Sequence, residues 1–420
     1  MKISNMSSKV APLRGMKDLL PEDYKVHKYI ETVAKKVSEL YGYEGFETPL
    51  LENAQIFDRT LGDTSDVVSK EMYSFADKKG RIIALRPEFT ASIVRAFISN
   101  GLKQNLPLKL FSSGPVFRYD RPQEGRQRQF HQLNFEYIGA IGPYSDSETI
   151  SMASRLLKEL GLTDDITLEL NSLGCTASRA KYQLALIEYF KKYENELSSD
   201  SKHRLEKNPL RILDSKDEGD KKLAENAPVI TSYYTKDAAK YFDEVKSYLD
   251  ILDVKYQINP RLARGLDYYC HTAFEFTTNK LGAQGTLLAG GRYDGLTKLM
   301  GSEEIPSIGF AAGIERLALM GNFKPEKSRP TIIMPIGDEC LNYCISLAKQ
   351  LRDRNIITAI SSSGKINKRM QNAISSNAKY VIFVGSAEQE KAICKLKDLD
   401  QNLEQEVPTS KLADIILIPA

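Results

Sequence analysis

Residues 117–136 read FRYDRPQEGRQRQFHQLNFE and form the most informative stretch of the chain. Pro122 and Gly125 mark a turn between two extended runs, so we expect a β-hairpin here. Four arginines fall on this hairpin: Arg118, Arg121, Arg126 and Arg128. Guanidinium groups are permanently charged and bind phosphate oxygens two at a time, which makes the hairpin a candidate phosphate site. The competing interpretation is a solvated basic hairpin with scattered ion pairs.

The return run of this hairpin, residues 129–138, carries polar side chains on a face that a strand would normally bury. Gln132, Asn134 and Glu136 alternate there with apolar residues, and a period of two is typical of a strand. Buried polar groups need hydrogen-bond partners. The pattern therefore indicates either a ligand or a polar network in the core.

Other strand-like runs lie close to the hairpin in the chain, at residues 46–51, 71–75, 81–85 and 108–116. The apolar spacing predicts helices at residues 23–41, 90–100 and 147–160. Several strands in succession with few helices between them favour an antiparallel sheet over a βαβ array. We therefore expect an α+β domain built on an antiparallel β-sheet.

Two regions depart from this pattern. Residues 172–254 are rich in helix and charge and poor in strands, and strand-like sequence resumes after them, which indicates a helical insertion. A polar linker flanked by prolines covers residues 322–330. Beyond it, strands predicted at residues 331–335, 356–360 and 380–384 alternate with helices at 340–355 and 365–377, as in a small α/β domain of βαβαβ order. We expect one domain at residues 1–325, interrupted by the insertion, and a second at 331–420.

Composition excludes several classes of protein. The chain has 420 residues with 58 basic and 55 acidic ones, so its net charge does not by itself indicate a nucleic-acid-binding protein. No run approaches the roughly 18 apolar residues of a membrane span, and the first ten residues lack the apolar segment of a secretory signal. Five scattered cysteines make no disulfide framework, which suits a reducing cytoplasm. The four histidines form no HExxH, and we assign no metal ligands to protein side chains.

Three more segments combine glycine with arginine or tyrosine. Residues 264–269 read RGLDYY and residues 289–295 read AGGRYDG. Residues 308–317, IGFAAGIERL, predict a strand of small residues that runs into a helix opening near Gly313. Arg316 then lies in the first turn, where it can reach a phosphate or a base. The chain has no GxxxxGK[ST] sequence, which excludes a Walker-type nucleotide site.

Taken in order, these segments resemble the three motifs of class II aminoacyl-tRNA synthetases. Motif 1 matches Pro49 in ETP, motif 2 matches the hairpin that begins at Phe117, and motif 3 matches GIER at 313–316. Four segments resemble signatures of histidyl-tRNA synthetases: RGMKDLLP at 14–21, LRPE at 85–88, NPLRILDSK at 208–216 and RGLDYY at 264–269. The resemblance spans nearly the whole chain. Asp120 departs from it, because motif 2 of the family usually has glutamate there.

The resemblance implies a class II catalytic domain, a C-terminal α/β anticodon-binding domain and the activity of a histidine–tRNA ligase. Histidine and ATP would give histidyl-adenylate and pyrophosphate, and the histidyl group would then pass to the 3′ end of tRNA-His. Because the substrate carboxylate attacks the α-phosphorus, no protein nucleophile is needed, and positioning and charge neutralisation dominate. ATP is a substrate, and Mg²⁺ is expected to bind with its phosphates.

The resemblance also implies roles for individual residues. The catalytic pair is Arg118, on the α-phosphate, and Arg264, between that phosphate and the histidine carboxylate. The ATP-binding residues are Arg118, Asp120, Arg126 and Arg316. The histidine-binding residues are Glu88, Thr90, Gln132, Glu136, Arg264, Tyr268, Tyr269 and Tyr293. Imidazole offers one donor and one acceptor, and Glu136 and Tyr269 are expected on its ring.

For tRNA, Arg121 and Gln123 at the hairpin tip are candidates for the acceptor end. Lys365, Lys368 and Arg369 form the best candidate patch on the anticodon side, and an exposed helix face without a partner is the competing interpretation. Motif 1 of the family packs across a two-fold axis, so we expect a homodimer. No membrane partner is expected.

Two alternatives belong to other functional classes or specificities. Paralogues of these synthetases include a regulatory subunit of ATP phosphoribosyltransferase and tRNA-sensing domains of kinases, which tend to lose motif arginines or the C-terminal domain. This chain keeps Arg118, Arg264, Arg316 and the α/β tail, which favours the enzyme. A class II synthetase for proline, threonine or glycine is disfavoured by Glu136 and RGLDYY.

Overall fold

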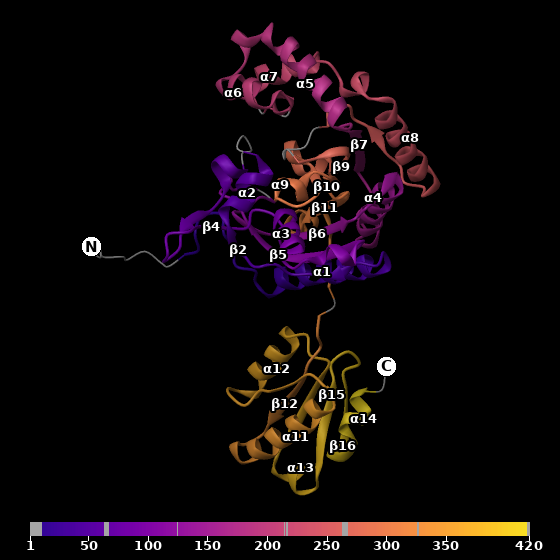
Figure 1. Cartoon of the computed structure of the whole chain (residues 1–420). Coiled ribbons are helices and arrows are strands. Elements are labelled where there is room, and N and C mark those ends of the chain that lie inside the picture. Colours follow the sequence, from indigo (N-terminus) through magenta and orange to yellow (C-terminus); the bar gives the residue numbers. More distant parts are fainter. Residues whose placement is uncertain are drawn as a thin grey trace, which may run out of the picture. The chain divides into compact units, whose positions relative to one another are not determined.

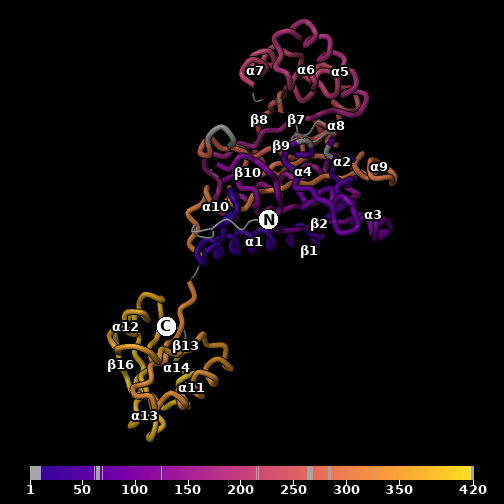
Figure 2. The backbone as a smooth tube through the Cα atoms, turned by 90° about the vertical axis from the view of Figure 1, so that its left-hand side faces the viewer, coloured from indigo at the N-terminus to yellow at the C-terminus, as the bar shows by residue number. Residues whose placement is uncertain are grey.

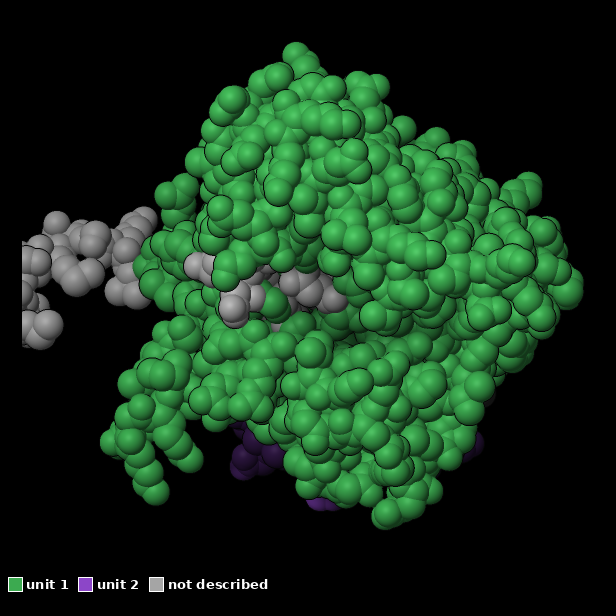
Figure 3. All heavy atoms as spheres, turned by 45° about the horizontal axis from the view of Figure 1, so that its top comes forward, with its two compact units in different colours: residues 1–324 green, residues 325–420 purple. Residues whose placement is uncertain are grey.

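The computed structural model describes residues 11–62, 67–123, 125–213, 215, 217–262, 268–325 and 327–417. The chain divides into two compact units, residues 1–324 and 325–420, which Figure 3 colours separately. Within the described residues, no helix is long and apolar enough to cross a membrane.

Unit 1 is built on an eight-stranded sheet with the order β1-β5-β6-β11-β10-β9-β7-β8. In that order the strands are β1 (Glu44–Gly45), β5 (Leu108–Phe117), β6 (Gln129–Ile138), β11 (Ser307–Gly313), β10 (Thr286–Arg292), β9 (Cys270–Thr278), β7 (Ile166–Ser172) and β8 (Gln257–Ile258). Only the two edge pairs, β1–β5 and β7–β8, are parallel. The antiparallel sheet predicted from the sequence is confirmed, and β5 and β6 form the predicted arginine hairpin.

Four helices of unit 1 belong to the main core: α1 (Pro21–Leu40), α4 (Gly142–Glu159), α8 (Lys236–Ile251) and α10 (Ile314–Met320). The apolar residues of β6 and its neighbours bury one face of the sheet in this core. The rings of Phe135 and Phe310, for example, stack with their centroids 4.4 Å apart. The other face of the sheet is thereby left for the polar residues of β6, because successive side chains point to opposite faces.

A second, smaller antiparallel sheet in unit 1 has the order β2-β4-β3. The strands of this sheet are β2 (Leu51–Asn53), β4 (Ile82–Leu85) and β3 (Ser74–Ala76). The helices of the same region are α2 (Ala54–Leu61), α3 (Thr90–Ser99) and α9 (Leu296–Leu299). The strand predicted at residues 71–75 is wrong in its first half, since a π-helical turn covers Val67–Glu71. Of the extended run predicted at residues 46–51, only Leu51 lies in a strand.

The region between β7 and β8 is helical, with α5 (Thr176–Lys191), α6 (Ser199–Lys207) and α7 (Glu218–Glu225) preceding α8. The first three lie together in both views (Figure 1, Figure 2) and enclose a core of their own, which includes Tyr182 and Phe190. In contrast, α8 packs against α4 and contributes Phe242 and Val245 to the main core.

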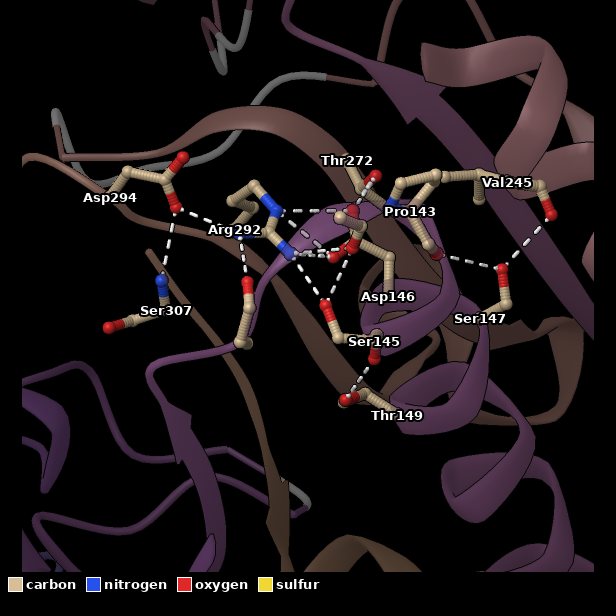
Figure 4. Close-up of polar contacts among 12 residues, drawn as sticks. Pro143, Ser145, Asp146, Ser147, Thr149, Val245, Thr272, Arg292, Asp294 and Ser307 are labelled. Atoms are coloured by element: carbon tan, nitrogen blue, oxygen red, sulfur yellow. Dashed lines mark hydrogen bonds and ion pairs between the residues drawn. The ribbon is translucent and has the colours of Figure 1, made fainter. Parts of the chain in front are cut away.

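A buried ion pair joins α4 to the end of β10 (Figure 4). The Arg292 guanidinium is 2% exposed and the Asp146 carboxylate 0%. Arg292 Nε donates to Asp146 Oδ1 at 3.0 Å, Nη2 to Ser145 Oγ at 2.8 Å and Nη1 to Asp294 Oδ1 at 3.0 Å. Thr272 on β9 donates its hydroxyl to the same aspartate. The network therefore fixes the strand end that carries the next residue, Tyr293.

Unit 2 has a five-stranded sheet of order β13-β12-β14-β15-β16. Its elements are β12 (Thr331–Pro335), α11 (Leu341–Asp353), β13 (Thr358–Ile360), α12 (Ile366–Ser375), β14 (Tyr380–Val384), α13 (Ser386–Glu390), β15 (Ile393–Asp398), β16 (Leu403–Pro408) and α14 (Leu412–Leu417). The predicted βαβαβ unit is present, with parallel β13, β12 and β14. The structure adds the antiparallel pair β15–β16, which the sequence analysis did not predict.

Candidate active site

A cavity of about 220 Å³ lies in unit 1 over the strands β6, β10 and β11. Most of the predicted site residues line it: Glu88, Thr90, Arg118, Asp120, Arg126, Gln132, Tyr268, Tyr269, Tyr293 and Arg316. They come from segments far apart in the chain, which the central strands bring together. The cavity is therefore the candidate active site.

Strand register explains the shape of the cavity floor. On β6, Gln132 and Glu136 stand opposite Gly313 and Gly309 of β11. A Cβ atom at Gly309 would lie 1.9 Å from Glu136 Oε2 and 2.5 Å from the carbonyl oxygen of Phe135. Glycine is thus required at this position if the Glu136 carboxylate is to lie flat against the neighbouring strand.

Glu136 is 1% exposed and receives three hydrogen bonds from groups that line the cavity. Thr90 Oγ1 donates to Oε1 at 2.5 Å, Asn134 Nδ2 donates to Oε1 at 2.8 Å, and the Tyr293 hydroxyl donates to Oε2. Burial raises the pKa of Glu136 to about 7, although these hydrogen bonds oppose the shift. The carboxyl group therefore changes its protonation state close to neutral pH.

Glu88 is held at the start of α3. Its carboxylate accepts hydrogen bonds from the backbone N–H groups of Thr90, at 2.7 Å, and Ala91, at 2.8 Å. A carboxylate at a helix N-terminus is favoured by the helix dipole, while burial raises the pKa of Glu88 above its ordinary value. Glu88 therefore satisfies two backbone N–H groups at the start of α3, and the same side chain lines the cavity.

Three tyrosines form one wall of the cavity. The rings of Tyr268 and Tyr269 lie 4.7 Å apart, and Tyr268 meets Tyr293 edge-on at 5.8 Å. Burial raises the pKa of Tyr268 and of Tyr293 well above the usual range, so both hydroxyls stay protonated. Arg179 of α5 donates to the carbonyl oxygen of Tyr269 at 2.6 Å, which ties the helical region to this wall.

Three arginines line the cavity, and each is positioned by a backbone or carboxylate oxygen. Arg118 Nε donates to the carbonyl of Pro87 at 2.9 Å, and Arg316 Nη1 donates to the carbonyl of Thr286 at 2.5 Å. Arg126 Nη1 pairs with Asp120 Oδ2 at 2.7 Å. These contacts leave further N–H groups of each planar guanidinium able to bind a ligand.

The same three arginines repel one another. Burial lowers the pKa of Arg316, and the positive charges of Arg126 and Arg118 lower it further. Burial likewise lowers the pKa of Arg118, with Glu71 and Glu88 opposing the shift and Arg126 adding to it. A cavity that gathers buried positive charge in this way is complementary to a polyanion.

Some predicted residues do not line the cavity. Glu136 is buried behind its surface, where its carboxylate accepts hydrogen bonds from Thr90, Asn134 and Tyr293, which do line it. Arg121 and Gln123 are exposed at the hairpin tip. Arg264 lies outside the described residues. In unit 2, Lys365 and Lys368 are exposed, but the prediction of Arg369 as part of an exposed patch is wrong. Its side chain is buried, and Nη1 donates to the carbonyl of Pro335 at 3.0 Å.

The structure also places residues at the cavity that were not assigned to the site from sequence, among them Gln127, Phe130, Asn134, Thr286, Leu287 and Glu315. Asn134 shares the polar alternation of β6, so its position was a usable signal. Glu315 immediately precedes Arg316, but nothing in the sequence showed that its carboxylate would accept a hydrogen bond from the His131 backbone at 3.0 Å. Thr286 acts through its carbonyl oxygen, which no side-chain pattern reports.

An antiparallel sheet that carries an arginine-lined cavity, together with a separate α/β unit, defines a class II aminoacyl-tRNA synthetase. The family model for histidyl-tRNA synthetase matches residues 15–317, and the model for the anticodon binding domain matches residues 331–417. The chain belongs to the histidyl-tRNA synthetase family.

Individual relatives agree. The chain is 58% identical over 412 residues to the histidine–tRNA ligase of Rickettsia bellii (strain RML369-C), covering 98% of this chain and 99% of that protein. It is also similar to the solved structure of apo histidyl-tRNA synthetase from S. aureus, with 34% identity, a TM-score of 0.83 and coverage of 97% and 99%. A Bacillus halodurans protein described as an ATP phosphoribosyltransferase regulatory subunit/histidyl-tRNA synthetase shares the fold, at 24% identity, a TM-score of 0.65 and coverage of 91% and 99%.

Proposed function

We propose that this chain joins histidine to tRNA-His at the cavity of unit 1. In the first step a carboxylate oxygen of histidine attacks the α-phosphorus of ATP, and pyrophosphate leaves. In the second step the terminal hydroxyl of the tRNA attacks the carbonyl carbon, and AMP leaves. The fold alone does not separate this enzyme from a regulatory paralogue, but identity of 58% over nearly the full chain favours the ligase.

The observation that carries the proposal is the crowding of Arg118, Arg126 and Arg316 around one cavity. Behind its surface, the buried carboxyl group of Glu136 is hydrogen-bonded to lining residues. A triphosphate would relieve the repulsion among the arginines, because its oxygens accept from planar guanidinium groups two at a time. Arg118 would then hold the α-phosphate, while Arg126 and Arg316 bind the outer phosphates and stack near the adenine. Asp120 would leave Arg126 and accept from the adenine.

Histidine is bound at the floor of the cavity. Glu136 accepts a hydrogen bond from one imidazole nitrogen, and Tyr269 interacts with the other. Glu88, Thr90 and Gln132 bind the α-amino group. The Oε1 atom of Gln132 is buried without a hydrogen-bond partner in the structure. Tyr268 and Tyr293 line the ring pocket. Arg264 is assigned to the carboxylate and the α-phosphate from the family resemblance alone.

Mg²⁺ would enter with the nucleotide. Of the carboxylates that line the cavity, Glu88 already accepts hydrogen bonds from the start of α3, and Asp120 is assigned to the adenine. Mg²⁺ prefers oxygen ligands and keeps several waters, so phosphate oxygens and water would be its main ligands here. The ion supplies charge neutralisation on the phosphates.

For tRNA, Arg121 and Gln123 project from the hairpin tip and are assigned to the acceptor end. Unit 2 is assigned to the anticodon, with the exposed Lys365 just before α12 and the exposed Lys368 in its first turn. Because ATP and tRNA are available in the cytoplasm, and the five cysteines of the sequence suit a reducing compartment, we assign the chain to the cytoplasm.

The chain is proposed to act as a homodimer through the region of motif 1. Leu50, Leu51, Phe75 and Ile82 of the small sheet and its entry are between 42% and 54% exposed. Apolar side chains gathered on one small sheet are typical of a covered surface. Sedimentation at micromolar concentration is expected to give twice the mass of 47.2 kDa. Phe75→Glu should shift the protein toward monomer, and Leu184→Glu, at an exposed position of α5, should not.

One experiment tests the activity directly. ATP–pyrophosphate exchange is measured with each of the twenty amino acids, followed by charging of tRNA-His. Exchange with histidine alone, together with charging, is the expected result. Exchange that depends on another amino acid, or none with any, would overturn the assignment.

A further inference from the structure

Three potential metal ligands from distant parts of the chain meet in unit 1, and the proposed reaction assigns a role to none of them. His27 lies on α1, His131 on β6 and Glu315 in the first turn of α10. One ligand atom from each lies within 4.8 Å of the others, the only such group among the described residues. His131 Nδ1 is 2.9 Å from Glu315 Oε1, and the two imidazole rings meet edge-on at 5.2 Å.

A second observation is that one ring nitrogen of His27 has no hydrogen-bond partner. His27 is 7% exposed, and its Nδ1 atom is buried without a hydrogen bond. Nearly all buried polar atoms in native proteins have a partner, so a buried orphan nitrogen needs an explanation. Neither packing in the core nor the neighbouring histidine supplies one.

We propose that His27, His131 and Glu315 form a binding site for Zn²⁺. Two imidazole nitrogens and one carboxylate oxygen are a donor set that zinc accepts with a fourth position left to water, at bond lengths of about 2.0–2.2 Å. Mg²⁺ and Ca²⁺ prefer sites made of oxygen alone, so the two histidines select against them. The site is distinct from that of the Mg²⁺ that accompanies ATP.

Glu315, whose carboxylate already accepts a hydrogen bond from the His131 backbone, can coordinate such an ion with little movement. Both oxygens of Glu315 lie 3.0 Å from the backbone nitrogen of His131. One oxygen can turn to the metal while the other keeps its hydrogen bond. Bound zinc would then link α1 and α10 to β6, on the side of the cavity where Arg316 follows Glu315.

The test uses the full-length protein freed of metal, with Co²⁺ as a visible probe and Zn²⁺ as its competitor. We expect one Co²⁺ per chain, with the absorption of a nitrogen- and oxygen-bound ion, displaced by one Zn²⁺. His27→Gln should weaken binding by more than about tenfold, since even the loss of a residue that only supports a ligand costs 10–100-fold. His203→Gln, at an exposed position of α6, is the matched control and should bind normally.

His131→Gln provides a second variant, and thermal unfolding shows whether each variant is folded. Failure of the wild-type protein to take up stoichiometric Co²⁺ or Zn²⁺ overturns the proposal. So does uptake that His27→Gln and His131→Gln leave unchanged, or a sulfur-to-cobalt absorption band, which would assign the metal to cysteines. None of these outcomes depends on histidine activation, so the zinc site and the proposed function fail separately.

Discussion

Glu136 is the residue whose protonation couples most directly to the proposed histidine site. Its pKa is raised to about 7, mainly by burial, so the folded protein keeps a proton that the unfolded chain has already released. The contribution of this group to folding stability is therefore fully present below the ordinary carboxyl pKa and is lost as the pH rises through about 7. Binding of imidazole should show the opposite trend, because the ionised carboxylate is the stronger acceptor.

We predict that the affinity for histidine rises as the pH increases through about 7, and that Glu136→Gln removes this part of the dependence. The imidazole of free histidine titrates in a similar range, so the variant separates the two groups. Loss of a hydrogen bond to a charged group should cost about 1.5–3 kcal/mol of binding free energy. Calorimetric titration of histidine across a pH series measures both effects. Identical pH profiles in the two proteins would show that Glu136 does not contact the ring.

Gly309 is predicted to be intolerant of even one methyl group. Gly309→Ala would place Cβ against Glu136 Oε2 and the Phe135 carbonyl, so β6 and β11 must separate or the carboxylate must turn. Overpacking of this kind should destabilise unit 1 by about 1–3 kcal/mol and raise the KM for histidine. The control is Gly313→Ala on the same strand, where the nearest atoms, from Arg316, lie 3.9 Å from the new Cβ. Urea unfolding measures the free energy of unfolding. If Gly309→Ala and Gly313→Ala lowered this free energy equally and raised the KM equally, the steric argument would be contradicted.

Much of the site could be predicted at this scale, because the residue types are concentrated in recognisable segments. The arginine hairpin and the alternation of Gln132 and Glu136 are read directly from the chain. The cluster of His27, His131 and Glu315 could not be predicted, since its members are separated by 104 and 184 positions and only the register of α1, β6 and α10 unites them. The partnership of Asp120 with Arg126 likewise depends on how the hairpin turns.

At the level of elements, the ion pair of Asp146 and Arg292 joins α4 to β10 (Figure 4). We predict that Asp146→Asn destabilises unit 1 by about 3 kcal/mol, because it leaves the arginine charge buried with Asp294 as its remaining carboxylate. Urea unfolding measures the change. Tyr293 follows Arg292, so the KM for histidine should rise as well.

A matched control for this ion pair lies in the same unit. Lys103 and Glu303 are paired at 2.7 Å with side chains 62% and 52% exposed. Glu303→Gln should cost less than about 1 kcal/mol, since water already solvates both charges. If the two variants were equally stable, burial would not be what gives the Asp146 pair its strength.

Prediction from sequence was most accurate where an element alternates cleanly or has clear ends. The strands at residues 331–335 and 380–384 and the return strand of the hairpin have the predicted bounds. The helix predicted to start at 147 begins at Gly142, because Pro143 suits the first turn. Strand β16 has five exposed residues among six, so it lacks the apolar alternation that would reveal it.

At the scale of the whole molecule, unit 2 has hydrophobic cores of its own, built around Ile333 and Ile382 on one side of its sheet and Met334 and Val381 on the other. Arg329 pairs with Asp400 at 2.6 Å, so the folded part of unit 2 begins before its first strand. A chain that ends at Lys324 therefore removes one unit without cutting through either core. Its unfolding transition should remain cooperative.

We predict that this shortened chain keeps histidine-dependent pyrophosphate exchange within about tenfold of the full chain, because every described residue of the cavity belongs to unit 1. Charging of tRNA-His should fall by roughly 10²-fold or more, since a tethered second binding module contributes affinity of that order. Unit 2 supplied as a separate chain should not restore charging, because the effective concentration conferred by the linker is lost. Normal charging by a folded chain ending at Lys324 would show that unit 1 alone recognises the tRNA. Loss of exchange and charging together, with unit 1 still folded, would instead mean that unit 2 shapes the cavity.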